Sequence, residues 1–267
     1  AEGASLGSGI DVAMKSNRLL HAMLKVRDVN ASIAFYERCG MKALSFAQRS
    51  SGAATAFVGY GEYKDAEHFA LELSAASPKS KKAQQPIELG SGFQYMGLAG
   101  SKAVAMLKSK AQDPDGYEIR AEPNVASGDF FATFCLAVSD VDASVRFYTE
   151  VLGMVKQSDE DVVALAKCGG RRYRFLRYSS GGGLDGTPTA LALVQSSADD
   201  FSLGSGFDHL AISTPDVQFA SQALQTANVQ VILPPTVMFG IKITGIRDPD
   251  GYAIYLVEED GFRSRSR

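Results

Sequence analysis

Histidine is scarce in this sequence, which makes its positions informative. The 267 residues include only His21, His68 and His209. Imidazole works near neutral pH as an acid, a base or a metal ligand. Two imidazoles and one carboxylate can hold Zn²⁺, Ni²⁺, Mn²⁺ or Fe²⁺, with water in the open positions. The three cysteines lack metal-type spacing, so we expect reduced and mostly buried thiols. No Ser-His-Asp or Cys-His arrangement follows from spacing alone.

The elements that must position these residues occur twice. Three motifs have two copies each: Met23–Val29 and Cys135–Val141, Leu89–Phe93 and Leu203–Phe207, and Asp113–Tyr117 and Asp248–Tyr252. The last pair is Asp-Pro-Asp-Gly-Tyr in both copies, and the second pair is Leu-Gly-Ser-Gly-Phe. An internal repeat indicates a duplicated architecture, and it allows corresponding positions to be compared within one chain.

Hydrophobic patterning divides the chain into four units of strand, helix and three strands. In the first unit a strand covers Leu19–Val26, and Asp28 caps a helix that ends at Gly40. The later units are Gly90–Ala121 with a helix over Ser101–Lys110, Phe131–Gln195 with a helix over 140–152, and Phe207–Val257 with a helix from Asp216 to Thr226. The number of residues from Phe93 to Asp113 is about half the number from Phe207 to Asp248. The second unit has therefore lost a loop and at least one strand, or that segment is missing from the sequence.

Bulk properties limit the classes of function. The formal net charge of −3 gives no reason to expect nucleic acid as a partner, and no apolar run reaches the roughly 20 residues of a membrane span. We expect a flexible arm over residues 1–17 and two domains, at 18–125 and 126–267. A start without methionine is consistent with a removed leader, so we expect a soluble protein of the cytoplasm or an organelle.

The repeated motifs resemble the glyoxalase I branch of the vicinal-oxygen-chelate superfamily, in particular the two-domain, plant-type lactoylglutathione lyases. The resemblance covers residues 19–258. It rests on His21–Val26 leading to Ser32–Tyr36, on Phe69–Ser74, on Gly206–Ile212 and on the two Asp-Pro-Asp-Gly-Tyr turns. It implies an α+β fold of four βαβββ modules in two tandem glyoxalase-like domains, with the second module shortened. It also implies that unit 1 pairs with unit 4, and unit 2 with unit 3.

The resemblance further implies two sites, each with four ligand positions usually occupied by His or Gln, Glu, His and Glu. The first site would consist of His21, Glu72, His209 and Tyr255, so that three of its four residues suit a divalent metal. Tyr255 stands where the family has a glutamate that is both metal ligand and catalytic base. A free phenol ionises near pH 10 and is a poor base at neutral pH. His21 and His209 could instead be relics that make only backbone contacts.

The second site would consist of Tyr95, Arg120, Thr133 and Ala192, none of which replaces a usual ligand. We therefore expect it to bind no metal. For substrate binding, the resemblance implies Arg38 for a glutathione carboxylate and Lys242 on the loop covering the pocket. Arg38 could equally be a solvated residue in the last turn of its helix.

Three functions remain open at this stage. The first is a metal-dependent, glyoxalase-I-like enzyme acting on glutathione hemithioacetals of 2-oxoaldehydes, with a partly degraded active site. The second is a catalytically inactive relative that serves as a structural or binding subunit, with protein partners in a larger assembly. The third is another metal-dependent reaction, because two histidines and one carboxylate also form the site of non-haem iron oxygenases.

Overall fold

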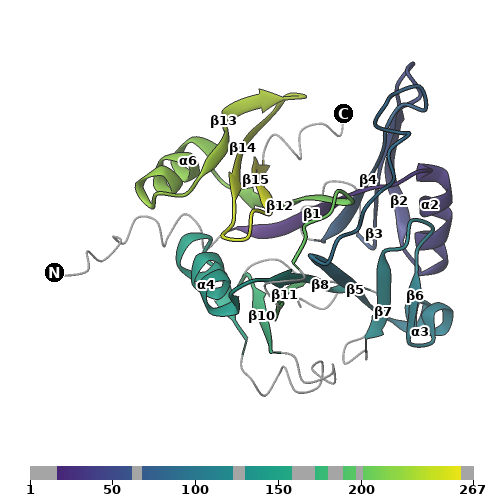
Figure 1. The fold of residues 1–267 in the computed structure, drawn as a ribbon, viewed down its shortest axis with the longest axis horizontal. Coiled ribbons are helices and arrows are strands. Elements are labelled where there is room, and N and C mark those ends of the chain that lie inside the picture. The colour runs from purple at the N-terminus through teal and green to yellow at the C-terminus, as the bar shows by residue number, and fades with distance from the viewer. Residues whose placement is uncertain are drawn as a thin grey trace.

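The chain folds into two mixed β-sheets that face each other, with helices at their flanks (Figure 1). The computed structural model describes residues 17–61, 68–122, 130–157, 172–179, 189–196 and 201–259. The predicted α+β class is confirmed. The predicted arm at 1–17 lies outside the described residues apart from Asn17, which is buried. The predicted boundary between the domains falls in 123–129, also outside the described residues, and stays a prediction.

Within the described residues, the first sheet has eight strands in the order β13-β14-β15-β12-β1-β4-β3-β2. They are β1 (Arg18–Lys25), β2 (Lys42–Gln48), β3 (Ala54–Gly59), β4 (Ala70–Ala75), β12 (Phe207–Thr214), β13 (Val231–Met238), β14 (Ile241–Arg247) and β15 (Ala253–Glu258). The antiparallel pair β1–β12 joins the first unit to the fourth, as the resemblance implies.

The second sheet has seven described strands in the order β6-β7-β5-β8-β11-β10-β9. They are β5 (Phe93–Ala99), β6 (Lys110–Gln112), β7 (Glu118–Glu122), β8 (Phe130–Val138), β9 (Val155–Lys156), β10 (Tyr173–Arg177) and β11 (Ala190–Gln195). Here the pair β5–β8 joins the second unit to the third. The second unit has three strands where the fourth has four, so the predicted shortening is confirmed.

The helices among the described residues are α2 (Val29–Arg38), α3 (Ser101–Leu107), α4 (Val141–Arg146) and α6 (Val217–Thr226), and a π-helical turn, η1 (Phe147–Val151), continues α4. Asp28, Asp140 and Asp216 cap α2, α4 and α6 by accepting bonds from backbone amides of the first turn. The helix expected over Ser101–Lys110 is shorter than predicted. Lys108 has a φ of 59°, which ends the helix and allows Lys110 to begin β6.

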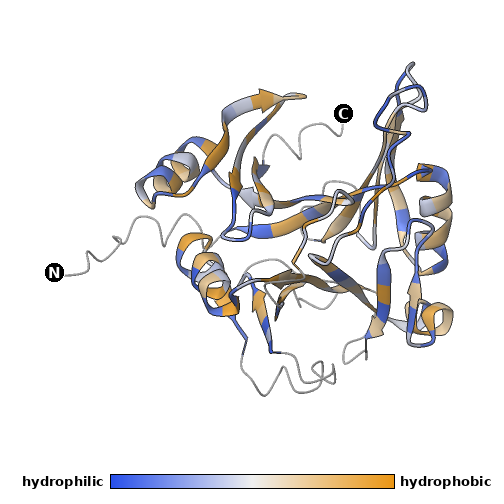
Figure 2. Ribbon diagram, in the orientation of Figure 1, coloured by the Kyte–Doolittle hydropathy of each residue, from blue (hydrophilic) through white to orange (hydrophobic). Residues whose placement is uncertain are grey.

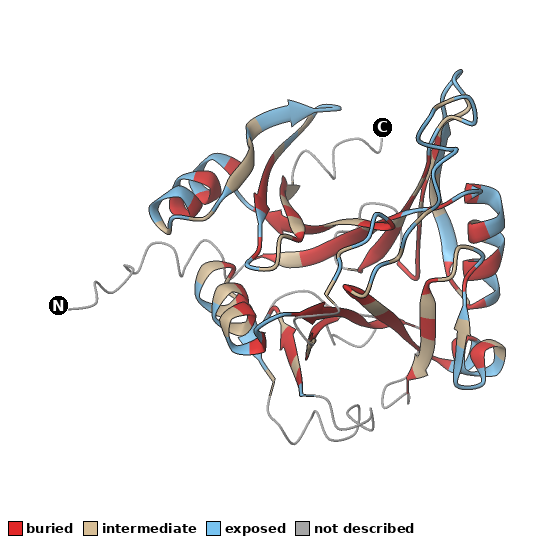
Figure 3. Ribbon diagram, in the orientation of Figure 1, coloured by how far each residue is buried: buried red, intermediate tan, exposed pale blue. Residues whose placement is uncertain are grey.

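Buried aromatic rings fill the space between the two sheets. Phe69, directly before β4, contacts Phe131 on β8, with ring centroids 4.7 Å apart, and Phe207 on β12 contacts Phe134 on β8 at 5.2 Å. Figure 3 shows the buried residues along the facing surfaces. Burial of large aromatic side chains is a major favourable contribution to folding. The strands that carry His21 and His209 are therefore set on a common core.

The Asp-Pro-Asp-Gly-Tyr turns link the units across the sheets. The hydroxyl of Tyr36 on α2 donates to Asp113 in the first turn at 3.0 Å, and that of Tyr148 donates to Asp248 in the second at 2.9 Å. The other oxygen of each aspartate accepts backbone amides of its own turn. Burial raises the pKa of Asp248 to about 6, so its hydrogen-bond donors are needed to accommodate a charge inside the protein.

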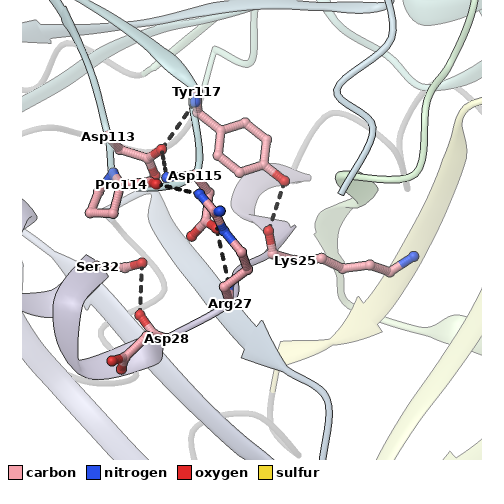
Figure 4. A network of polar contacts seen from close by, with 8 residues as sticks. All are labelled: Lys25, Arg27, Asp28, Ser32, Asp113, Pro114, Asp115 and Tyr117. Atoms are coloured by element: carbon pink, nitrogen blue, oxygen red, sulfur yellow. Dashed lines mark hydrogen bonds and ion pairs between the residues drawn. The ribbon is translucent and has the colours of Figure 1, made fainter. Parts of the chain in front are cut away.

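Further contacts of the first turn reach β1. The hydroxyl of Tyr117 donates to the carbonyl of Lys25 at 2.9 Å (Figure 4). The guanidinium of Arg27 donates to Asp115 at 2.7 Å and to the carbonyl of Pro114 at 2.7 Å (Figure 4). The Tyr117 contact joins the turn before β7 to β1, and the Arg27 contacts join the same turn to the segment after β1. The first turn therefore positions the strand that carries His21.

The two Leu-Gly-Ser-Gly-Phe motifs cross each other with reciprocal hydrogen bonds. The amide of Ser91 donates to the carbonyl of Ser202, and the amide of Ser205 donates to the carbonyl of Glu88. A Cβ on Gly204, whose φ is +69°, would lie 2.5 Å from the carbonyl oxygen of Glu88. Only glycine allows this close approach. The motif that occurs in both copies is thus the point at which the copies contact each other.

The β13–β14 hairpin carries apolar residues at its tip (Figure 2). Val237 and Phe239 are 64% and 63% exposed, and Phe239 adopts a φ of 52° in the two-residue turn that it forms with Gly240. The guanidinium of Arg49, which follows β2, lies 5.9 Å from the centre of the Phe239 ring. This contact joins the two edges of the first sheet.

Among the described residues, no helix is long and apolar enough to cross a membrane.

Replacing Tyr36 or Tyr148 by phenylalanine should lower the free energy of unfolding by about 1–3 kcal/mol, because a buried carboxylate loses a donor. Tyr60→Phe is the matched control, since the Tyr60 hydroxyl donates to a neutral acceptor, the carbonyl of Cys39. Urea unfolding should show a smaller loss for the control, and equal losses would contradict the role given to the aspartates.

Gly204→Ala should destabilise the chain much more than Gly116→Ala. Both glycines have positive φ, but a Cβ on Gly116 meets its nearest neighbour, a leucine methyl, at 3.4 Å. We expect a loss of about 1 kcal/mol at Gly116 and at least about 3 kcal/mol at Gly204, where backbone must move. Thermal unfolding of both variants measures the difference, and similar melting temperatures would disprove the crossing constraint.

Candidate metal centre

Three predicted metal ligands lie together on adjacent strands of the first sheet. His21 is on β1, Glu72 on β4 and His209 on β12, and β1 lies between the other two strands. One donor atom from each of the three lies within 4.8 Å of the others, and among the described residues no other such group of histidine, cysteine, aspartate and glutamate occurs. Nε2 of His21 is 3.2 Å from Oε2 of Glu72. The ring centroids of His21 and His209 are 5.6 Å apart.

Strand register explains this convergence. His21 pairs with Ala70 across β1–β4, so that Glu72 lies two residues beyond its direct partner. His209 pairs with Ala253 across β12–β15, and Tyr255 lies two residues beyond. Side chains two residues apart on a strand share a face of the sheet. Each parallel pair therefore presents two side chains at the same relative positions.

Burial and hydrogen bonding favour a neutral imidazole next to an ionised carboxylate. Burial lowers the pKa of His21, against the opposing effect of its contact with Glu72. Burial also disfavours ionisation of Glu72, but chiefly its hydrogen bond with His21 outweighs this effect and holds the pKa of Glu72 below its ordinary value. Neutral imidazole and carboxylate are the protonation states in which these groups bind metal. The donor set therefore fits Zn²⁺, Ni²⁺, Mn²⁺ or Fe²⁺.

Tyr255 lies against this group of donors. Its ring meets the His209 ring edge to face, with centroids 4.7 Å apart and planes at 85°. The ring also covers Gly245 on the neighbouring strand β14, where an added Cβ would lie 2.7 Å from Cε1 of Tyr255. Gly245 thus provides the space in which Tyr255 packs beside His209.

Sequence analysis did not identify Asp208 and Lys25 as residues of this site. Nδ1 of His209 is 3.0 Å from Oδ2 of Asp208, and Nζ of Lys25 is 3.0 Å from the other carboxylate oxygen. The hydrogen bond from His209, together with Lys25, holds the pKa of Asp208 well below its usual range. The sequence signal was the carboxylate directly before His209, which strand alternation alone would place on the opposite face.

The two predicted substrate-binding residues are not brought to the donor group. Arg38 is exposed at the end of α2, where its guanidinium lies 5.5 Å from the centre of the Phe35 ring. Nζ of Lys242 is 2.8 Å from Oε1 of Glu258, and Glu258 follows Tyr255 by three residues, on the opposite face of β15. The other oxygen of Glu258 accepts the amide of Val217 at the start of α6. Lys242 thus points toward α6.

The corresponding positions of the second sheet carry a different set of contacts. The guanidinium of Arg120 lies 3.9 Å from the centre of the Tyr95 ring, and the hydroxyl of Thr133 donates to Glu122 at 3.0 Å. Glu122 is buried, which raises its pKa to about 7, and its carboxylate occupies the space that a Cβ on Gly97 would need. Ala192 offers no donor. Protein side chains thus occupy the place where the first sheet has its donor group.

Comparisons with known proteins agree with the fold. Residues 130–256 match the Glyoxalase/Bleomycin resistance protein/Dioxygenase superfamily. The chain is 26% identical to a probable chloroplastic lactoylglutathione lyase of Arabidopsis thaliana, covering 92% of this chain and 74% of the relative. It is also 26% identical to a lactoylglutathione lyase of rice, covering 92% and 90%.

Solved structures give the same result over nearly the whole chain. A glyoxalase I mutant of Zea mays superposes with a TM-score of 0.79 at 26% identity, covering 97% of this chain and all of the maize chain. The structure of glyoxalase I from Zea mays superposes with a TM-score of 0.77 at 25% identity, covering 94% and 95%. The chain is therefore a two-domain homologue of plant-type glyoxalase I, within the glyoxalase or vicinal-oxygen-chelate superfamily.

Proposed function

We propose that this chain binds one divalent metal ion at His21, Glu72 and His209 and acts on the hemithioacetal formed by glutathione and a 2-oxoaldehyde. The observation that carries the proposal is the convergence of three donor atoms within 4.8 Å on adjacent strands of a glyoxalase I fold. The names of the plant relatives supply the substrate class. A bound metal would supply a Lewis acid that polarises a substrate oxygen.

The side chains of the site have different roles in the proposed reaction. His21 and His209 provide neutral donors, and Glu72 provides the negative charge that balances the cation. Tyr255 lies against His209 at the position where glyoxalase I relatives have their base. In the proposed reaction it holds or moves the proton transferred between neighbouring carbon atoms of the substrate. Because a free phenol ionises near pH 10, we expect slow proton transfer at neutral pH.

A tyrosine at position 255, where the resemblance implies a glutamate, also supports the alternative of an inactive relative that retains the metal site. The two readings differ in turnover and agree in metal binding. Zn²⁺ binding and turnover must therefore be measured separately. In both readings the second site contributes no metal, since its positions carry Tyr95, Arg120, Thr133 and Ala192.

His209→Ala and Glu72→Gln should each weaken Zn²⁺ binding by about 100-fold or more, because each removes one of three protein donors. Isothermal titration of the metal-free full chain measures affinity and stoichiometry, and we expect one ion per chain. His68→Gln is the control, since His68 is the remaining histidine and lies at no ligand position. Loss of binding in the control, or unchanged binding in the two variants, would disprove the metal site.

Tyr255→Glu should raise the rate of hemithioacetal isomerisation by about 10²-fold or more, because a well-placed carboxylate base contributes rates of that order. Tyr255→Phe, which keeps the ring over Gly245 but removes the hydroxyl, should abolish any residual activity. Initial rates with the hemithioacetal of methylglyoxal and glutathione measure both. No turnover in the wild type or in Tyr255→Glu, with metal bound to both, would establish the inactive alternative.

A further inference from the structure

The strand that carries His209 contains a β-bulge directly beside it. Along the β1–β12 pair, Met23 pairs with His209 and the next residue, Leu24, pairs with Phe207. Asp208 is therefore an extra residue without a direct partner on β1. A bulge of this kind bends the strand and redirects a side chain, and bulges are frequent next to active sites. It explains how two consecutive residues of one strand reach each other.

The redirected carboxylate makes two contacts. Oδ2 of Asp208 is 3.0 Å from Nδ1 of His209, and Oδ1 is 3.0 Å from Nζ of Lys25. The side chain of His209 is 12% exposed and that of Asp208 is 34% exposed, so water competes only in part for the His209 contact. Lys25 lies on β1, the same strand as His21. Both carboxylate oxygens are thereby engaged and the orientation of Asp208 is restricted.

We propose that Asp208 is a positioning residue, which accepts a hydrogen bond from the Nδ1–H group of His209 and so leaves Nε2 as the nitrogen that binds metal. The inference rests on the proposed metal site. A hydrogen bond from one ring nitrogen to a carboxylate fixes both the tautomer and the ring orientation of a metal-binding histidine. Lys25 assists by holding the second oxygen of the carboxylate.

The second sheet provides an internal comparison. Along β5–β8, Phe93 pairs with Leu136 and Tyr95 pairs with Cys135, so that Gln94 is the extra residue. Gln94 precedes Tyr95 as Asp208 precedes His209, and its amide nitrogen donates to the carbonyl of Ser91 at 2.6 Å. The scaffold thus forms this bulge without a carboxylate. A carboxylate occurs only at the bulge of the first sheet, where the candidate metal ligand His209 follows. This supports a role of Asp208 at the metal site and not in the fold.

The test compares Asp208→Ala with Asp208→Asn in the full-length, metal-free chain. Nitrogen-15 NMR of the histidine rings reports which nitrogen of His209 carries the proton, and titration with Zn²⁺ reports affinity. In the wild type we expect the proton on Nδ1. In Asp208→Ala we expect a shift toward the Nε2-protonated form and a loss of about 10- to 100-fold in Zn²⁺ affinity. Asp208→Asn should retain the wild-type tautomer and most of the affinity, because its amide oxygen accepts the same bond.

Both variants lack the carboxylate charge, so the difference between them isolates the hydrogen bond. The inference is overturned if His209 of the wild type carries its proton on Nε2, if Asp208→Ala leaves the tautomer unchanged, or if the two variants lose affinity equally. Absence of Zn²⁺ binding in the wild type would disprove the proposed function, whereas the tautomer of His209 still decides the role of Asp208. Urea unfolding verifies that both variants are folded.

Discussion

A buried hydrogen bond between a helix tyrosine and a turn aspartate, made once in each half of the chain, is the constraint on which the other features depend. Tyr36 and Asp113 belong to different units and different sheets, and so do Tyr148 and Asp248. Each bond places a charged group in the interior, where leaving it without a donor is costly. These bonds tie α2 and η1 to the turns that lead into β7 and β15. Each bond thereby links a unit of one sheet to a unit of the other.

The crossing of the two Leu-Gly-Ser-Gly-Phe motifs adds a second constraint with a direct effect on the site. The second motif ends at Phe207, where β12 begins, and His209 follows two residues later. The backbone contact at Gly204 therefore sets the start of the strand that presents a candidate ligand. The first motif ends at Phe93, where β5 begins, and Tyr95 follows at the equivalent position. One geometry is thus built twice, with a histidine in one copy and a tyrosine in the other.

Sequence reasoning predicted several features of the fold. The shortened second unit follows from comparing one copy with the other, the caps Asp28 and Asp216 follow from the local sequence, and the pairing of units follows from the family resemblance. It could not locate β2, because this edge strand is mostly exposed and its apolar side chains show no clear alternation. It extended the helix at Ser101 too far, since nothing in the composition marks Lys108 as a residue with positive φ.

Predictions for individual site residues depended on tertiary contacts. Glu72 and His209 were assigned from the ligand positions that the family resemblance implies, because strand register preserves such spacing. Lys242 could not be oriented, since its partner Glu258 becomes a neighbour only when β14 pairs with β15. Asp208 was missed because a regular strand would turn it away from His209, and a bulge is invisible in the sequence.

We propose that the duplicated scaffold holds one metal-binding site, whereas protein side chains occupy the equivalent position in the other sheet. Anomalous diffraction at the zinc edge, from crystals of the full chain grown with Zn²⁺, tests this most directly. We predict one strong peak per chain, bordered by His21, Glu72 and His209, and no peak beside Tyr95, Arg120 and Thr133. A chain without a peak at the three donors, or with its peak at the second position, would contradict the account.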